Sequence, residues 1–249
     1  MSNSIVGTDT GGTFTDFVLI EEDKLIIHKV PSTPSDQSQA VADGLKAIPL
    51  LSGTVISHGS TVATNALLER KGAKTALIAT DGFEDIIQIG RQARHELYAL
   101  DYQAPEPLVP PDLRIGIAER IDASGAVIKK LEQGEIDRLL AILSDLNVEA
   151  ISVSLLFSFL RPDHEEALKS ALDLLEPRPF ISLSSEVLPE FREFERTSTV
   201  TVNSYVGPLV SRYLGRMEGL IGRPLRVMQS SGGSVTADLA RRQPVRTIL

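Results

Sequence analysis

The chain has 249 residues, of which 42% are hydrophobic and 23% charged, and it carries a formal net charge of −8 at pH 7. These values are typical of a globular protein with a substantial core, and the length allows one large domain or two small ones. The acidic balance, without any run of Lys or Arg, argues against a nucleic-acid partner, and the absence of cysteine excludes disulfides and thiolate nucleophiles.

No segment approaches the roughly 20 consecutive apolar residues that cross a bilayer. Residues Met1 to Asp9 lack the basic start and apolar stretch of a secretory signal. We therefore expect a cytoplasmic protein with no membrane partner. Tryptophan is absent and aromatic residues make up 5% of the chain, which argues against an aromatic-lined groove for sugars or bases.

Apolar periodicity and turn residues divide the chain into alternating strands and helices. The predicted strands cover residues 5–10, 13–20, 25–30, 54–57, 75–79, 150–157, 180–184 and 225–229. The predicted helices cover residues 35–48, 60–71, 83–89, 135–146, 163–175 and a long region from 189 to 221. Residues 114–121 and 126–131 are expected to form a hairpin. Residues 244–249 resemble a buried strand, so we expect the polypeptide to continue. This order predicts an α/β fold with a mixed sheet.

Local signals also predict how the helices begin, end and pair. Ser35 and Ser60 are expected N-caps, and Gly72 is expected to adopt the left-handed conformation that ends a helix. In the charged segment 190–196, we expect a structural ion pair at i to i+3 spacing, either Glu193 with Arg196 or Arg192 with Glu195.

The most informative motif is the glycine hairpin Gly7-Thr-Asp-Thr-Gly-Gly-Thr-Phe-Thr-Asp16. Its glycines allow the backbone to approach a ligand and to adopt positive φ, threonines supply hydroxyls, and two aspartates supply oxygen ligands for a hard cation. The alternative is a hairpin whose Asp and Thr side chains satisfy its own backbone. We predict that it binds ATP and Mg²⁺. The predicted ATP contacts are Asp9, Thr10, Gly11, Gly12, Thr13, Thr15 and Asp16, with Asp9 and Asp16 as metal ligands.

Three further segments carry candidate site residues. The segment from His58 to Asn65 lies where a strand is expected to lead into a helix, a natural position for an anionic or carbonyl-bearing ligand. In isolation, a capped helix with a structural histidine is the favoured reading there. Two guanidiniums in 90–94 suit carboxylate or phosphate recognition, or a solvated helix end. The glycines of 229–233 fit a nucleotide-side loop or a plain strand-to-helix turn.

The hairpin resembles the first phosphate loop of the actin, heat-shock ATPase and sugar-kinase superfamily. Together with later motifs, it identifies the chain as a member of the hydantoinase A and 5-oxoprolinase family, which includes ATP-dependent ketone carboxylase subunits. The motifs are Ser57-His-Gly-Ser-Thr-Val-Ala-Thr-Asn65, Thr80-Asp-Gly-Phe-Glu-Asp85, Ile89-Gly-Arg-Gln92, Glu119-Arg-Ile-Asp122, Leu188-Pro-Glu-Phe-Arg-Glu-Phe-Glu-Arg-Thr-Ser198 and Met228-Gln-Ser-Ser-Gly-Gly233.

The resemblance implies an actin-like (ribonuclease H-like) ATPase lobe with a family-specific α/β insertion in residues 1–179, and an incomplete second domain in residues 180–249. The resemblance reverses the preference for a structural histidine at position 58 and implies a functional role for His58. The implied catalytic residues are His58, Thr61 and Asn65, the implied substrate-binding residues are Arg91, Gln92 and Arg94, and Gly232 and Gly233 join the ATP contacts. His95 departs from the commonest family pattern, which has proline after the second arginine.

The resemblance further implies an ATP-dependent cyclic-amide hydrolase that phosphorylates the substrate carbonyl oxygen before ring opening. Its implied partners are a small-molecule cyclic amide, a hydantoinase B-type subunit and a second copy of the chain. The alternatives are a nucleotide-binding subunit of a ketone carboxylase and a non-catalytic assembly module. Since family members have another phosphate loop beyond the position of residue 249, the chain alone is expected to be inactive.

Overall fold

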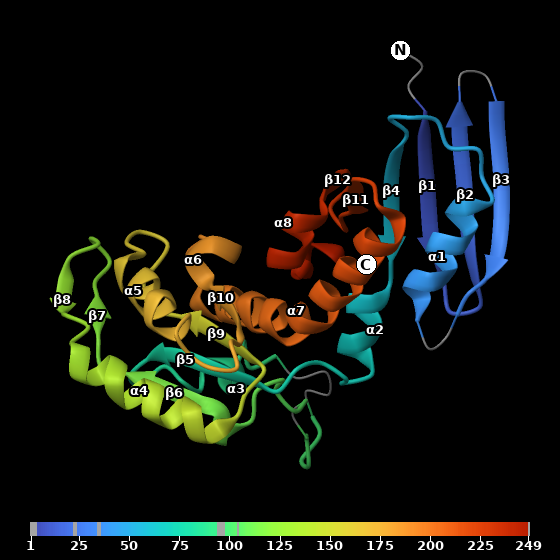
Figure 1. Cartoon of the computed structure of the whole chain (residues 1–249). Helices are drawn as coiled ribbons and strands as arrows, with labels where there is room; N and C mark the ends of the chain where they lie inside the picture. Colours follow the sequence, from blue (N-terminus) through green and yellow to red (C-terminus); the bar gives the residue numbers. More distant parts are fainter. Residues whose placement is uncertain (1–3, 22–23, 34–35, 94–97, 104, 249) are drawn as a thin grey trace. The chain divides into compact units, whose positions relative to one another are not determined.

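The structure, a computed structural model, describes residues 4–21, 24–33, 36–93, 98–103 and 105–248. The chain divides into two compact units, shown in Figure 1. Unit 1 comprises Met1–Lys71 and Leu209–Leu249, and unit 2 comprises Gly72–Pro208. The mixed α/β architecture predicted from the sequence is confirmed. The domain division predicted between residues 179 and 180 stays a prediction.

Unit 1 is built on a mixed six-stranded sheet with the order β12-β11-β4-β1-β2-β3. Strands β1, β2 and β3 form an antiparallel meander, β4 and β11 continue the sheet parallel to β1, and β12 closes it antiparallel to β11. The bounds are β1 Ile5–Thr10, β2 Phe14–Glu21, β3 Lys24–Pro31, β4 Val55–Ser60, β11 Leu225–Met228 and β12 Ser234–Thr236.

The strands of unit 1 alternate between a buried face and an exposed face, as a period of two requires. Val6, Phe17 and Leu19 are buried, and helix α1 (Gln37–Lys46) packs on the meander strands. The remaining helices of this unit are α2 (Val62–Leu68), α8 (Ala237–Arg242), the 3₁₀ turn Pro244–Thr247 and the C-terminal part of α7 (Glu193–Ile221).

Unit 2 contains a four-stranded parallel sheet with the order β10-β9-β5-β6. Its central strands, β5 (Thr75–Thr80) and β9 (Ala150–Ser154), are buried throughout, as strands covered on both faces should be. The other elements are α3 Ile86–Ile89, the 3₁₀ turn Pro111–Leu113, β6 Arg114–Ile117, β7 Arg120–Ile121, β8 Val127–Lys129, α4 Gln133–Leu146, α5 Asp163–Leu172, β10 Phe180–Leu183 and α6 Ser184–Val187.

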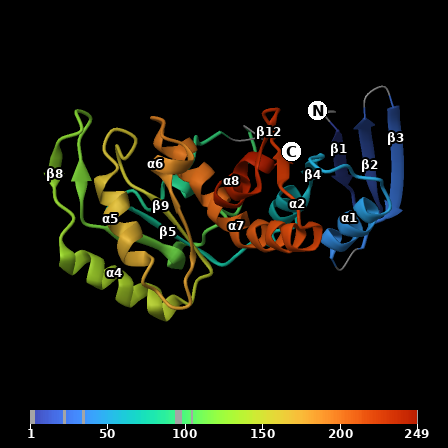
Figure 2. The ribbon, with the colours of Figure 1, turned by 45° about the horizontal axis from the view of Figure 1, so that its top comes forward.

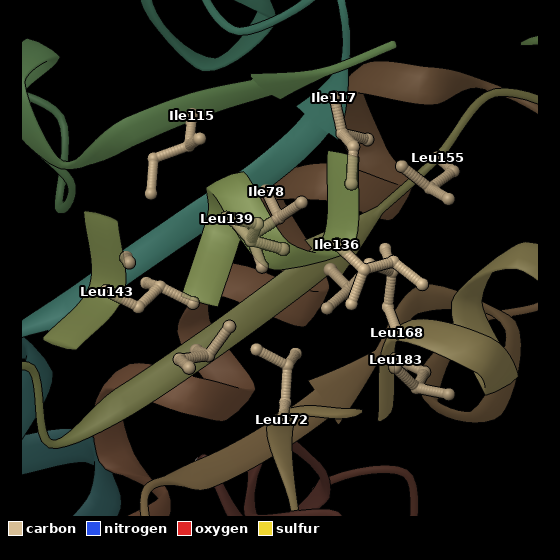
Figure 3. Packing of buried hydrophobic residues seen from close by; sticks show 13 residues of the cluster. Ile78, Ile115, Ile117, Ile136, Leu139, Leu143, Leu155, Leu168, Leu172 and Leu183 are labelled. Atoms are coloured by element: carbon tan, nitrogen blue, oxygen red, sulfur yellow. The ribbon is translucent and has the colours of Figure 1, made fainter. Parts of the chain in front are cut away.

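The main core of unit 2 lies between this sheet and helices α4 and α5, which lie side by side in Figure 2. Figure 3 shows its side chains: Ile136, Leu139 and Leu143 of α4 meet Leu168 and Leu172 of α5 and the isoleucines of the strands. On the opposite face, Leu77 packs with Val109 and Leu113, and serines of β9 and β10 hydrogen-bond to α7. Ser154 Oγ lies 2.8 Å from Thr197 Oγ1, and Asn203 Nδ2 donates to Ser182 Oγ at 3.0 Å.

Several local predictions are corrected by the structure. Residues 114–131 do not form one hairpin: β6 joins the parallel sheet beside β5, and only β7 and β8 pair antiparallel. Residues 244–247 form a 3₁₀ turn and not a strand, while Leu249 lies outside the described residues. No helix within the described residues is long and apolar enough to cross a membrane.

The helix boundaries differ for identifiable reasons. Asp36 caps α1, accepting a hydrogen bond from the Ser38 N–H at 3.1 Å, while Ser35 lies outside the described residues. The positive φ after α2 belongs to Arg70 at 55° and not to Gly72. A Cβ atom at Gly72 would lie 2.1 Å from the Tyr205 ring, so the glycine is required by close packing.

Candidate functional site

The candidate site in unit 1 lies at one edge of its sheet. Strands β1, β4 and β11 are parallel neighbours, so their carboxyl ends meet at this edge. The hairpin turn after Thr10, the residues that follow Ser60 and the turn after Met228 therefore come together. Three segments that are far apart in sequence, each containing predicted site residues, converge here because the strand order brings them there.

The side chain of Asp9 lies over a glycine of the neighbouring strand. Asp9 is in register with Gly59 of β4, and a Cβ atom at Gly59 would lie 3.2 Å from Asp9 Oδ1 and 3.6 Å from Met228 Sδ. A larger residue would therefore crowd the carboxylate. Asp9 is exposed, and the described residues place no hydrogen-bond donor or cation on it. The two carboxylate oxygens of Asp9 are therefore available to a ligand, and they suit a hard cation.

The turn after β1 presents open backbone groups. The Gly11 N–H donates to the Phe14 carbonyl at 3.0 Å, and Ser32 Oγ donates to the Gly11 carbonyl at 2.8 Å, which fixes the turn. Gly12 and Thr13 are exposed, and a Cβ atom at Gly12 would meet nothing within 4 Å. Neither glycine has positive φ, so that expectation is wrong. Without side chains, Gly11 and Gly12 allow a ligand to approach the backbone closely, and the open turn fits the oxygen atoms of a phosphate chain.

Strand alternation separates the other predicted ATP contacts. Thr10 and Thr15 form a cross-strand pair whose side chains are buried on the inner face, and Thr15 Oγ1 lies 3.1 Å from Ser32 Oγ. Asp9 and Asp16 form the neighbouring pair on the other face. The Asp16 carboxylate is 2.9 Å from Lys29 Nζ, its partner in the next strand. Of the two predicted metal ligands, Asp9 fits a cation directly, and Asp16 would have to exchange Lys29 for it.

The structure places His58 within strand β4, not in the loop that follows it. The ring is completely buried: Nδ1 lies 2.7 Å from Thr8 Oγ1 and Nε2 lies 2.9 Å from the Tyr213 hydroxyl. Burial lowers the pKa of His58 to about 4 and raises the pKa of Tyr213 to about 12. Both groups are therefore neutral at pH 7, and both ring nitrogens are occupied. The catalytic role of His58 stays a prediction.

The other predicted residues at this edge lie on its surface. Asn65 is exposed, and its side-chain amide donates to Thr61 Oγ1 at 3.3 Å, while Thr61 makes no side-chain capping bond to helix α2. Ser60 Oγ accepts from the Val62 N–H at 3.2 Å. Gly232 and Gly233 have φ of 92° and 75°, because 229–233 is the tight turn of the β11–β12 hairpin and not a strand-to-helix turn.

The predicted substrate-binding residues lie in unit 2. Arg91 and Gln92 follow α3 and line a pocket of about 640 Å³ that Tyr102 and Phe194 also border. Arg94 lies outside the described residues. The Arg91 guanidinium binds the Glu195 carboxylate through two nitrogens, with N–O distances of 2.6 to 2.8 Å. Arg91 thus does form the bidentate pair for which arginine is suited, but with a residue of its own chain.

The expected ion pairs within 190–196 are replaced by other contacts. Glu195 binds Arg91, and the buried Arg196 donates to the carbonyls of Glu190 and Leu155, each at 2.9 Å. Burial lowers the pKa of Arg196. The sequence contains no local signal for these contacts, since Arg91 and Glu195 are 104 positions apart. Lys29, in contrast, could have been found by counting cross-strand pairs outward from the hairpin turns.

Comparison with known proteins gives consistent matches along the chain. Residues 5–174 match the hydantoinase/oxoprolinase N-terminal region, and residues 196–249 match hydantoinase/oxoprolinase. The chain is 33% identical over 261 residues to caprolactamase subunit alpha of Pseudomonas jessenii, covering 98% of this chain and 38% of that protein. It is 35% identical over 271 residues to the acetophenone carboxylase gamma subunit of Aromatoleum aromaticum, covering 97% and 37%.

A solved structure shows the same fold over the whole chain. The chain superposes on the nucleotide-free structure of acetone carboxylase, an enzyme of ATP-dependent acetone carboxylation, with a TM-score of 0.87 at 25% sequence identity. The match covers 100% of this chain and 39% of that one. The chain therefore spans well under half the length of the relatives that it matches.

Proposed function

The chain belongs to the hydantoinase/oxoprolinase family, and from this premise we propose that it is the N-terminal, ATP-binding part of an ATP-dependent cyclic-amide hydrolase. The fold implied by the sequence, an actin-like ATPase lobe, is confirmed by the structural similarity. Relatives of the chain include ATP-dependent enzymes and named subunits of larger enzymes.

The observation that carries the proposal is the open carboxylate of Asp9 beside the exposed turn at Gly12 and Thr13. The hairpin supplies backbone groups that can approach a phosphate chain, and Gly59 leaves room for the Asp9 side chain to face a cation. Such positioned groups stabilise charge that shifts during phosphoryl transfer. We assign Asp9 the binding of magnesium and assign the 11–13 turn the orientation of the phosphates.

In the proposed reaction, the amide oxygen attacks the terminal phosphorus of ATP and ADP leaves. Water then adds to the activated carbon, and the ring C–N bond breaks with the nitrogen leaving as an amine, which gives an acyl phosphate. A second water cleaves this acyl phosphate to a carboxylate and free phosphate. ATP supplies the phosphoryl group, and the chain positions it. The complete reaction belongs to the longer parent protein, with a hydantoinase B-type subunit as the proposed partner and His58, Thr61, Asn65, Gln92 and Arg94 as proposed contributors.

The test is the variant Asp9→Asn in the full-length parent enzyme, which keeps the shape of the side chain and removes its charge. We expect the ATPase rate to fall at least ~100-fold, the scale of losing one positioned electrostatic group, with an unchanged melting temperature. The matched control is Asp43→Asn, at an exposed aspartate of α1 that is not among the predicted ATP contacts. Wild-type turnover in Asp9→Asn would contradict the proposal.

A second candidate is a nucleotide-binding subunit of an ATP-dependent ketone carboxylase. It is favoured by the similarity to the acetophenone and acetone carboxylases. The two functions share the phosphorylation of a carbonyl or enol oxygen and differ in the attacking group. ATP hydrolysis that depends on a cyclic amide supports the first candidate, and ATP hydrolysis that depends on a ketone and bicarbonate supports the second.

A further inference from the structure

A second pocket in unit 2 lies near the point between β5 and β9 where the strand order of the parallel sheet reverses. The loop after β5 leads to β6 on one side, while the loop after β9 leads to β10 on the other. Ligands of open parallel sheets bind at the carboxyl ends of such neighbouring strands. The pocket, of about 490 Å³, is lined by residues after β5, residues after β9 and the start of α7. This volume is within the usual range for small-molecule sites.

The lining of this pocket is aromatic. Of the eight phenylalanines in the chain, four line it: Phe157, Phe159, Phe191 and Phe194. The rings of Phe157 and Phe159 have centroids 6.1 Å apart, and Phe191 is 65% exposed. The low aromatic content of the sequence thus conceals a local concentration. Large apolar side chains gathered around a hollow are the usual lining of a site that takes an apolar group.

Two lining residues also have an uncommon backbone conformation. Phe157 has φ of 56° and Arg192 has φ of 76°, in the left-handed region that side-chain-bearing residues rarely adopt. Both residues belong to the segments, 157–159 and 191–194, that contribute the phenylalanines lining the pocket. Strained residues of this kind gather at ligand sites.

The charges around the pocket balance one another. The Arg91 guanidinium is already bound at both ends by Glu195, and the Arg192 guanidinium lies 5.3 Å from the centre of the Phe191 ring. Glu193 also lines the pocket. A carboxylate on a ligand would have to displace Glu195 from Arg91 or draw Arg192 away from the Phe191 ring, and it would meet Glu193. An uncharged ligand needs neither change.

We propose that this pocket binds the hydrocarbon ring or aryl substituent of an uncharged cyclic amide. This substrate class rests on the proposed function and refines it: an apolar lactam or an aryl-substituted hydantoin is bound in preference to a carboxylate-bearing ring such as 5-oxoproline. The phenylalanine rings contact the apolar part of this ligand.

The first measurement is calorimetric titration of the full-length protein with 5-benzylhydantoin, caprolactam and 5-oxoproline. We expect 5-benzylhydantoin to bind most tightly, and Phe191→Ala to weaken its binding about tenfold, through the loss of one aromatic contact. Phe191 is exposed enough for the variant to fold, and Phe194→Ala is the second test. The control is Leu174→Ala, whose side chain is 80% exposed in the same unit and outside the pocket.

The outcomes separate this inference from the proposed function. Tighter binding of 5-oxoproline, no binding of 5-benzylhydantoin, or unchanged affinity in both phenylalanine variants would overturn the pocket assignment. ATP hydrolysis stimulated by 5-oxoproline alone would overturn it too, while leaving the cyclic-amide hydrolase function in place. Binding that depends on Phe191 but is accompanied by no ATP hydrolysis with any cyclic amide would support the pocket and contradict the hydrolase.

Discussion

His58 shows how a single side chain can be decided by its surroundings. Its local sequence context, after a predicted strand and before a predicted helix, favours a structural histidine, and only the family resemblance implies a catalytic role. In the fold, His58 lies inside strand β4 and not in the loop after it, and its two ring nitrogens are hydrogen-bonded to Thr8 and Tyr213. A neutral, fully bonded imidazole stabilises the protein, because removing one partner would leave a buried polar group unsatisfied.

The pKa of His58 predicts a pH dependence of stability. Since burial lowers its folded pKa to about 4 from an ordinary value of 6.5, the unfolded chain binds a proton before the folded chain does. Stability from this group is fully present above pH 6.5 and is lost as the pH falls toward 4, by an amount on the order of 3 kcal/mol.

Two measurements check this expectation. Urea unfolding at a series of pH values between 7.5 and 4.5 should give a declining free energy of unfolding, and the decline should be smaller in His58→Gln. If that variant does not fold, an NMR titration of the wild-type imidazole decides instead. Titration of His58 near pH 6.5 would show that the ring is open to water.

At the scale of elements, helix α1 can pack on strand β2 because Gly44 leaves room for an aromatic ring. A Cβ atom at Gly44 would lie 2.2 Å from the Phe17 ring. Both residues are buried in unit 1. The helix therefore approaches strand β2, which follows the hairpin turn, more closely than a residue with a side chain at position 44 would permit.

We expect Gly44→Ala to destabilise the protein by about 1–3 kcal/mol, the usual cost of overpacking a core. The matched control is Gly215→Ala in α7, where a Cβ atom meets nothing within 4 Å. The control should be neutral or stabilising by up to about 1 kcal/mol, since alanine is the better helix former. Chemical denaturation of both variants measures the difference. Equal stabilities would show that Phe17 moves aside without cost.

At the scale of the whole molecule, one unit is continuous in sequence and the other is not. Unit 2 is the single segment Gly72–Pro208, with its own sheet and its own core between the sheet and helices α4 and α5. Unit 1 needs two segments, because β11 from the second segment completes the sheet beside β4 of the first.

We therefore expect the polypeptide 72–208 to fold alone with a cooperative thermal transition, as continuous domains with one core do. The polypeptide 1–71 should not, since it lacks the strands and helix that cover Ile56 and His58. Circular dichroism melting curves of the two fragments provide the comparison. A cooperative transition in 1–71, or its absence in 72–208, would contradict this division of the chain.

The sequence by itself determined most of the order of strands and helices, the hairpin at residues 5–20 and the family. These depend on local information: apolar periodicity, turn residues and motifs of consecutive residues. The helix predicted over residues 135–146 is α4, and its residues Ile136, Leu139 and Leu143 are buried. The pairing of Asp16 with Lys29 was not predicted, although counting along the meander could have found it.

Only the tertiary structure decided which side chains meet across the chain. Strand alternation places Asp9 and Asp16 on the opposite face from Thr10 and Thr15, but only the packing of the sheet decided that the face with the threonines is the buried one. The burial of His58 beneath Tyr213 and the gathering of four phenylalanines depend on strand order. Contacts between residues separated by many tens of positions are set by packing of whole elements, and no local pattern encodes them.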